Sequence, residues 1–131
     1  MQKNSLLLIL FFSLSGCYQV ERNCTDFHTG TYEFEQIVGD KLLRSTFIRT
    51  DSLEVEFFED KIDSASIRWV NDCECILTKL NPETNQDKRP ISIRIVSTSK
   101  KDYVFEYALV GNSKNKQRGT ITKISDSIVR P

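Results

Sequence analysis

The chain has 131 residues, and its 18 Lys and Arg residues balance 18 Asp and Glu residues, so the formal net charge is zero. This balance argues against a nucleic-acid partner, because neutralising phosphates requires a basic face. The paired lysines Lys100-Lys101 and the cluster at 114–116 are better explained as solvated hairpin tips.

The segment 1–16 has the parts of an export signal. Lys3 supplies positive charge, residues 6–12 form an unbroken apolar run, and the small residues Ser15-Gly16 follow. This run is shorter than the about 20 apolar residues that a membrane-spanning helix requires. We therefore predict that residues 1–16 are a cleaved signal peptide.

Leu14-Ser15-Gly16-Cys17 resembles the bacterial lipobox at every position, with an aliphatic residue, two small residues and a cysteine. It predicts a mature chain that starts at Cys17 and carries acyl chains such as palmitate there. Each buried methylene contributes about 0.8 kcal/mol, so several chains together anchor a protein that does not span the membrane. Because Tyr18 rather than Asp follows, we expect the cell outer membrane and its periplasmic side. Residues 17–28 are predicted to be the lipidated cysteine and a short tether.

Beyond the tether, apolar and polar residues alternate, which is typical of strands with one buried face. In "DSLEVEFF", Leu53, Val55 and Phe57 are predicted to face the core. Glu54 and Glu56 are predicted to face water. The predicted strands are residues 30–38, 42–50, 53–58, 64–70, 73–80, 91–98, 103–110 and 117–124.

The breaks between these strands are short, and each is rich in residues that tolerate turns. Short connections imply antiparallel neighbours. We therefore predict one all-β domain over residues 29–124, a single antiparallel meander of about eight strands that forms either a curved sheet or an up-and-down barrel. Residues 125–131 are predicted to be a loosely held C-terminal tail.

Three cysteines remain after Cys17, and an oxidising envelope favours one disulfide among them. A bond between Cys73 and Cys75 would be strained, because residues two apart on a strand share a face. We favour a bond between Cys24 and Cys73, with Cys24 to Cys75 as the alternative. The remaining cysteine is expected to be a buried, unreactive thiol.

Nothing in the sequence predicts catalysis. The only histidine, His28, has no partner that the sequence identifies, and a nucleophilic triad requires a base with one. The "CEC" motif lacks the paired half-sites of a zinc centre, and no phosphate-binding glycine loop is present. We expect no catalytic residue, no metal and no cofactor, and therefore no enzyme.

The barrel interior is the remaining candidate for a function. Arginines recur in the predicted strands at Arg49, Arg68, Arg94 and Arg118, and we expect them to face outward. If several faced inward, they would form a site for an anionic head group. Aromatic residues are predicted to line the interior, as core or as the wall of a ligand cavity: Tyr32, Phe34, Phe57, Trp69, Phe105 and Tyr107.

The segments "CTDFHTGTYEFE", "RSTFIRTDSLEVEFFEDK", "IRWVNDCEC" and "QRGTITK" together resemble a group of short uncharacterised lipoproteins of the Bacteroidota type. The resemblance favours the Cys24 to Cys73 bond and makes Cys75 the odd thiol. Proteins of this group sometimes carry the label "DNA topoisomerase IV", which the residues do not support, because such an enzyme needs an ATPase module, a metal-binding acidic module and a far longer chain. Gly30-Thr31-Tyr32 also gives a weaker resemblance to lipocalin-like barrels.

These observations predict a lipid-anchored protein of the cell envelope. Its leading expected role is non-enzymatic, as an accessory or binding module for another envelope protein. The alternative is a lipocalin-like carrier with a small apolar or amphipathic ligand inside the barrel. A cavity walled by the aromatic residues would favour the carrier, whereas tight packing among them would favour the accessory module.

Overall fold

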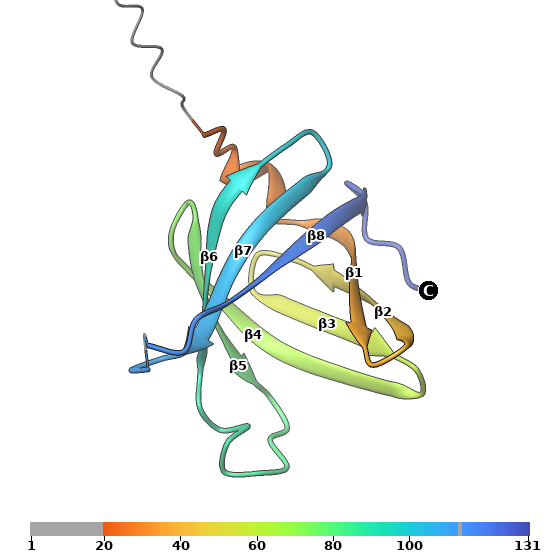
Figure 1. The fold of residues 1–131 in the computed structure, drawn as a ribbon, viewed down its shortest axis with the longest axis vertical. Coiled ribbons are helices and arrows are strands. Elements are labelled where there is room, and N and C mark those ends of the chain that lie inside the picture. Colours follow the sequence, from red (N-terminus) through yellow and green to blue (C-terminus); the bar gives the residue numbers. More distant parts are fainter. Residues whose placement is uncertain (1–19, 113) are drawn as a thin grey trace, which may run out of the picture.

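The computed structural model describes residues 20–112 and 114–131, so Cys17 and the predicted signal peptide lie outside the described residues. It is a closed barrel of eight antiparallel strands, in which each strand pairs with its neighbours in sequence and β8 pairs with β1 (Figure 1). The expected all-β meander is confirmed, and the barrel is the form that it takes. The elements are η1 (Cys24–Phe27), β1 (Gly30–Val38), β2 (Lys41–Arg49), β3 (Leu53–Phe58), β4 (Lys61–Asn71), β5 (Glu74–Lys79), β6 (Ile91–Thr98), β7 (Asp102–Leu109) and β8 (Gln117–Ser125).

The strand limits follow the alternation in the sequence closely. Seven strands begin and end within one residue of the predicted limits, and β4 begins three residues earlier than expected, at Lys61. The break predicted over 59–63 is only a tight turn at Glu59-Asp60, and Glu59 adopts the left-handed conformation there, with φ of 51°. A two-residue turn with positive φ suits the right-handed twist of a hairpin.

The two ends of the barrel differ. The capped end carries the chain entry, η1 and the connections β2–β3, β4–β5 and β6–β7. The mouth carries the hairpin turns β1–β2 and β3–β4 and the longer connections β5–β6 and β7–β8, at the opposite end in Figure 1. The mouth therefore lies at the end of the barrel opposite η1.

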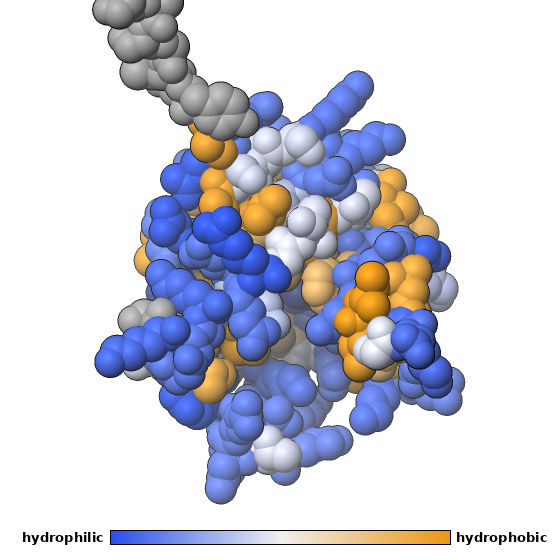
Figure 2. Space-filling model, viewed as in Figure 1, coloured by the Kyte–Doolittle hydropathy of each residue, from blue (hydrophilic) through white to orange (hydrophobic). Residues whose placement is uncertain are grey.

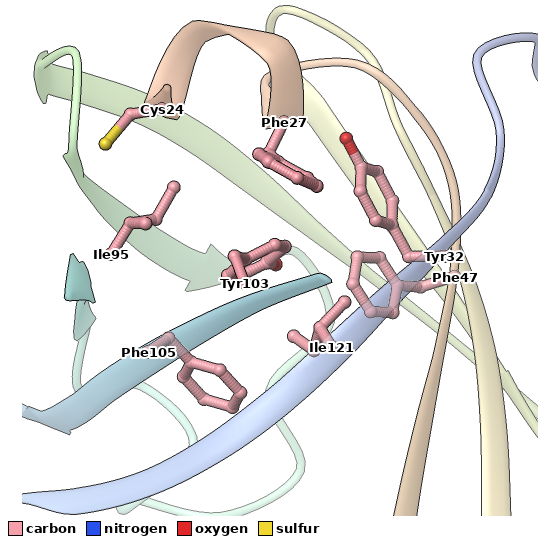
Figure 3. Close-up of a cluster of buried hydrophobic side chains, with 8 residues drawn as sticks. All are labelled: Cys24, Phe27, Tyr32, Phe47, Ile95, Tyr103, Phe105 and Ile121. Atoms are coloured by element: carbon pink, nitrogen blue, oxygen red, sulfur yellow. The ribbon is translucent and has the colours of Figure 1, made fainter. Parts of the chain in front are cut away.

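The core fills the capped half of the barrel. Tyr32 stacks on Phe47 with ring centroids 5.0 Å apart, and Phe27 of η1 meets Tyr103 edge-on at 5.1 Å. Gly119 makes room for this packing, since a Cβ atom there would lie 2.8 Å from the Phe105 ring. The core cluster drawn in Figure 3 consists of Cys24, Phe27, Tyr32, Phe47, Ile95, Tyr103, Phe105 and Ile121.

The segment expected to be a tether belongs to the fold from Glu21 onward. The Thr98 amide donates a hydrogen bond of 2.8 Å to the Glu21 carbonyl, and Cys24 and Phe27 are both buried. The expected tail also makes contacts, because the Thr31 hydroxyl donates to the Ser127 carbonyl at 2.7 Å. The predicted tether (17–28) and the predicted tail (125–131) were both expected to lie outside the domain, because neither segment shows the alternation of a strand. Their described residues instead contact the barrel.

Candidate binding site

The end of the barrel that η1 (Cys24–Phe27) covers is called the cap below. A disulfide between Cys24 and Cys73 holds η1 in place there, which confirms the favoured pairing. It ties η1 to the β4–β5 turn across 49 residues of sequence. Cys75 is the free thiol and is buried, as expected. Burial raises the pKa of Cys75 to about 12, although the neighbouring Arg49 acts in the opposite direction. At neutral pH this thiol is therefore protonated and a weak nucleophile.

Arg49 is the charged centre of the cap, with only 1% of its surface exposed. Its guanidinium donates to the Glu54 carboxylate at 2.9 Å, to the Phe27 carbonyl at 2.9 Å and to the Tyr103 hydroxyl at 3.0 Å. The same group lies 5.0 Å from the Tyr32 ring centroid. Burial acts to lower the pKa of Arg49, but the surrounding groups, with Tyr103 and Glu54 first among them, together raise the pKa overall. The charge is thus permanent and fully paired.

This arrangement corrects the expectation that all four strand arginines face outward. Arg68, Arg94 and Arg118 are exposed, whereas Arg49 lies inside. An anionic head group would need free donors, and the guanidinium of Arg49 already binds protein oxygens on each of its nitrogens.

Strand β3 presents the opposite face from the one predicted. Residues directly opposite in an antiparallel pair share a face, and Glu54 and Glu56 lie opposite Arg49 and Phe47. Both glutamates therefore point into the barrel. Phe57 pairs with Thr46 on the outer face, so its assignment to the interior wall is wrong, and Leu53 and Val55 face outward with it. The buried charge of Arg49 requires the Glu54 carboxylate beside it. Because side chains alternate with a period of two, an inward Glu54 determines which residues of β3 face inward and which face outward.

The mouth half of the barrel is hollow. A cavity of about 310 Å³ lies between strands β3 to β7 and the β5–β6 connection, and we call it the mouth cavity. A second hollow of about 240 Å³ lies against β1, β2 and β3. Glu56 lines both. The mouth cavity is lined by Glu54, Glu56, Asp63, Ser64, Ala65, Leu77, Lys79, Gln86, Asp87, Arg89, Ile91 and Leu109.

The aromatic residues predicted as a ligand wall do not surround one cavity. Phe105 packs edge-on against Phe34 at 6.0 Å and stacks on Tyr107 at 5.6 Å. Tyr32 is completely buried in the cap, and Trp69 stacks on His28 at 3.7 Å. Of the six predicted residues, Phe34 alone lines either of the mouth hollows. The aliphatic and acidic wall of the mouth was missed, because it depends on how strands far apart in sequence meet.

Charged groups in the mouth cavity are unevenly paired. Lys79 Nζ lies 3.6 Å from Asp87 Oδ1, and Glu54 is held by Arg49. Glu56 lies directly opposite Asp63 across β3 and β4, so two carboxylates point to the same side. Burial raises the pKa of Glu56, Glu54 and Asp63 add to the effect, and Lys79 opposes it.

His28 belongs to the cap. Its Nε2 atom lies 2.7 Å from the Asp72 carbonyl, and its ring covers Trp69. The indole Nε1 of Trp69 is buried without a hydrogen-bond partner. Across residues 20–112 and 114–131, no group of three or more His, Cys, Asp or Glu side chains is arranged to hold a metal ion. In the same part of the chain, no helix is long and apolar enough to cross a membrane.

No protein-family model matches this chain, and no curated protein or solved structure matches it.

Proposed function

We propose that this protein is a lipid-anchored binding module of the cell envelope, held at the outer membrane through Cys17, and that its ligand occupies the mouth of the barrel. The observation that carries this proposal is the contrast between the two ends. The capped end is filled by aromatic residues and the paired Arg49, whereas the mouth holds two hollows that meet at Glu56. Concave sites with apolar walls and a few convergent polar groups are the usual form of ligand pockets.

A module with an open site is a better fit than a carrier that encloses its ligand. The aromatic residues pack on one another, so they leave no deep chamber among themselves. A volume of about 310 Å³ is at the lower end of the range of about 300–1,000 Å³ for ligand pockets. It suits a small molecule or one side chain of a partner. Binding without catalysis also agrees with a cap whose histidine and thiol are both packed away from the mouth.

Blocking the mouth tests this proposal. Ala65 faces the cavity, since it lies opposite Glu54, whereas its neighbour Ser66 is exposed on the outside of β4. We expect n-hexanol and n-hexylammonium to bind the full chain in calorimetry and Ala65→Trp to weaken that binding at least tenfold. Ser66→Trp is the matched control and should bind as the wild type does. Equal binding by Ala65→Trp and the wild type would refute a mouth site.

A further inference from the structure

We infer that the mouth cavity selects a positively charged amine carried on an apolar chain, with Glu56 as the charge partner of that amine. The inference deepens the proposed function and rests on it. It follows from three features of the cavity: its unpaired negative charge, its facing carboxylates and its apolar walls.

The unpaired charge in the cavity is negative at Glu56 and Asp63. Glu54 is neutralised by Arg49 at 2.9 Å, and Asp87 is near Lys79 at 3.6 Å. Within residues 20–112 and 114–131, Glu56 and Asp63 make no ion pair and no side-chain hydrogen bond; Lys79, which is paired with Asp87, acts on Glu56 only at longer range and opposes the rise of its pKa. Arg89 also lines the cavity, but its side chain lies exposed at the rim.

The two unpaired carboxylates stand directly opposite each other on β3 and β4, and both point inward. Like charges directly opposite each other in this cross-strand position are destabilising. Glu56 is partly buried and Asp63 is exposed, so the repulsion acts at the edge of the cavity, where water screens the Glu56 side less than an open surface would. A cation placed between Glu56 and Asp63 would turn the repulsion into two attractions.

The walls beside these carboxylates are apolar. Leu77, Ile91 and Leu109 line the mouth cavity on β5, β6 and β7. Phe34 and Phe58 line the second hollow, on the other side of Glu56. An ammonium group at Glu56 can therefore extend an alkyl chain into either hollow and remove apolar surface from water, at about 25 cal/mol per Å². Neither a bare metal ion nor a fatty acid matches this combination of charge and wall.

An alkylammonium group can reach the cavity from two sources, a free aliphatic amine or the lysine side chain of a peptide. The recognition chemistry is the same in both, because a lysine carries its ammonium on an apolar stem. The test therefore compares ligands of one length and different charge, and then presents the same amine on a peptide.

The experiment is calorimetric titration of the full chain with n-hexylammonium, n-hexanol and n-hexanoate at one ionic strength. We expect hexylammonium to bind at least tenfold more tightly than hexanol, and hexanoate to bind more weakly than either. Hexanoate binding as tightly as hexylammonium would overturn the inference but leave the proposed function standing. If none of the three ligands binds in a manner that Ala65→Trp weakens, the proposed function itself fails.

Variants at Glu56 connect the preference to one residue. Glu56→Gln keeps the shape of the side chain, and we expect it to lose at least tenfold of the hexylammonium affinity while hexanol binding stays unchanged. Glu56→Asp, which keeps the charge, should restore most of the preference. Glu59→Gln removes a carboxylate from the exposed turn that follows β3 and is the matched control. An unchanged hexylammonium affinity in Glu56→Gln would overturn the role of Glu56.

The source of the amine is resolved by a second titration. An acetylated lysine amide and a short peptide with one lysine are compared with hexylammonium. Tighter binding of the peptide identifies a protein segment as the occupant, and tighter binding of hexylammonium identifies a free amine; both results support the inference. Failure of all three ammonium compounds to bind, beside a hexanol that binds, would overturn it.

Discussion

Arg49 keeps a full positive charge in the interior of a small barrel. Moving such a group out of water is costly unless every donor finds an acceptor. The Glu54 carboxylate, the Phe27 carbonyl and the Tyr103 hydroxyl meet that requirement, and they come from β3, η1 and β7. One side chain thereby connects the cap helix with two strands of the barrel wall.

We predict that Arg49→Met lowers the free energy of unfolding by about 3–5 kcal/mol, because it leaves the buried Glu54 carboxylate without its partner. Urea denaturation followed by circular dichroism measures the change. Arg44→Met is the control on the same strand: its ion pairs with Glu33 and Glu35 are on the outer surface, where such pairs contribute about 0–1 kcal/mol. Similar losses in the two variants would contradict the central role of Arg49.

The burial of Cys75 leads to a second prediction about a single residue. Because burial raises its pKa to about 12, we expect the native protein to show no reaction with a thiol reagent at pH 8. In denaturant without reductant, one thiol should react, that of Cys75, since Cys24 and Cys73 are joined. Replacing Cys24 with Ala should add the Cys73 thiol to the count in denaturant. A thiol that reacts rapidly in the native state would contradict the burial of Cys75.

The position of Arg49 was open to prediction from its strand. In "STFIRT", an inward Phe47 places Arg49 on the same face by the period of two. An outward Arg49 was nevertheless the expectation, because isolated arginines in strands are mostly solvated. The β2–β3 register then places Glu54 opposite Arg49, so Glu54 also faces inward. As a result, the inward and outward faces of β3 are the reverse of those predicted. Apolar alternation alone does not distinguish the two faces of a strand when the interior itself holds charged groups.

At the scale of elements, the facing carboxylates of β3 and β4 affect stability as well as binding. The folded-state pKa of Glu56 is raised, chiefly by burial and then by Glu54 and Asp63, against Lys79. The folded protein therefore binds this proton more tightly than the unfolded chain does. The contribution of Glu56 to stability is most favourable at pH values below its unfolded pKa, and it is lost as the pH rises through the folded pKa.

We predict that Glu56→Gln stabilises the protein at pH 7, by roughly 0.5–1 kcal/mol, because it removes a like-charge pair. The gain over the wild type should shrink toward zero as the pH is lowered, since protonation then removes the same charge from the wild type. Thermal unfolding of both proteins between pH 4 and pH 7, with Glu59→Gln as the control, measures the difference. If the variant is less stable than the wild type at pH 7, the Glu56 carboxylate makes favourable interactions that outweigh its repulsion by Asp63, and the prediction is wrong.

At the scale of the whole molecule, closure of the barrel was beyond local sequence patterns. Alternation and turns predict strands and their antiparallel neighbours, and those predictions are confirmed. Closure depends on β1 meeting β8, for example at Phe34 opposite Ile121, which lie at opposite ends of the domain. Nothing local in either strand distinguishes that pairing from an open edge. The mouth cavity has the same origin, because its walls come from β3 to β7 and from the β5–β6 connection.

The attachment point is the last consequence of the whole arrangement. Chain entry at the capped end means that an anchor at Cys17 would hold the barrel by η1, with the mouth directed away from the lipid. The exposed apolar residues Ile37, Val38 and Leu42 belong to the β1–β2 hairpin at that distal end, and Figure 2 shows hydrophobic residues gathered on this side of an otherwise mainly hydrophilic face. A partner that binds at the mouth would therefore approach the barrel from the side that points away from the membrane.

We predict that Cys17→Ala moves the protein from the membrane fraction to the soluble fraction of the cell envelope, because under the proposed function the acyl chains on Cys17 would supply the attachment. We expect the variant and the wild type to have the same unfolding midpoint. The first contacts of the described chain with the barrel are at Glu21, and the disulfide joins Cys24 to Cys73, so Cys17 takes part in neither. Fractionation with a carbonate wash, together with the intact mass of each form, measures both the attachment and the acylation. Cys75→Ala is the matched cysteine control and should stay with the membrane. If Cys17→Ala stays with the membrane after the wash, acylation of Cys17 is not what attaches the protein.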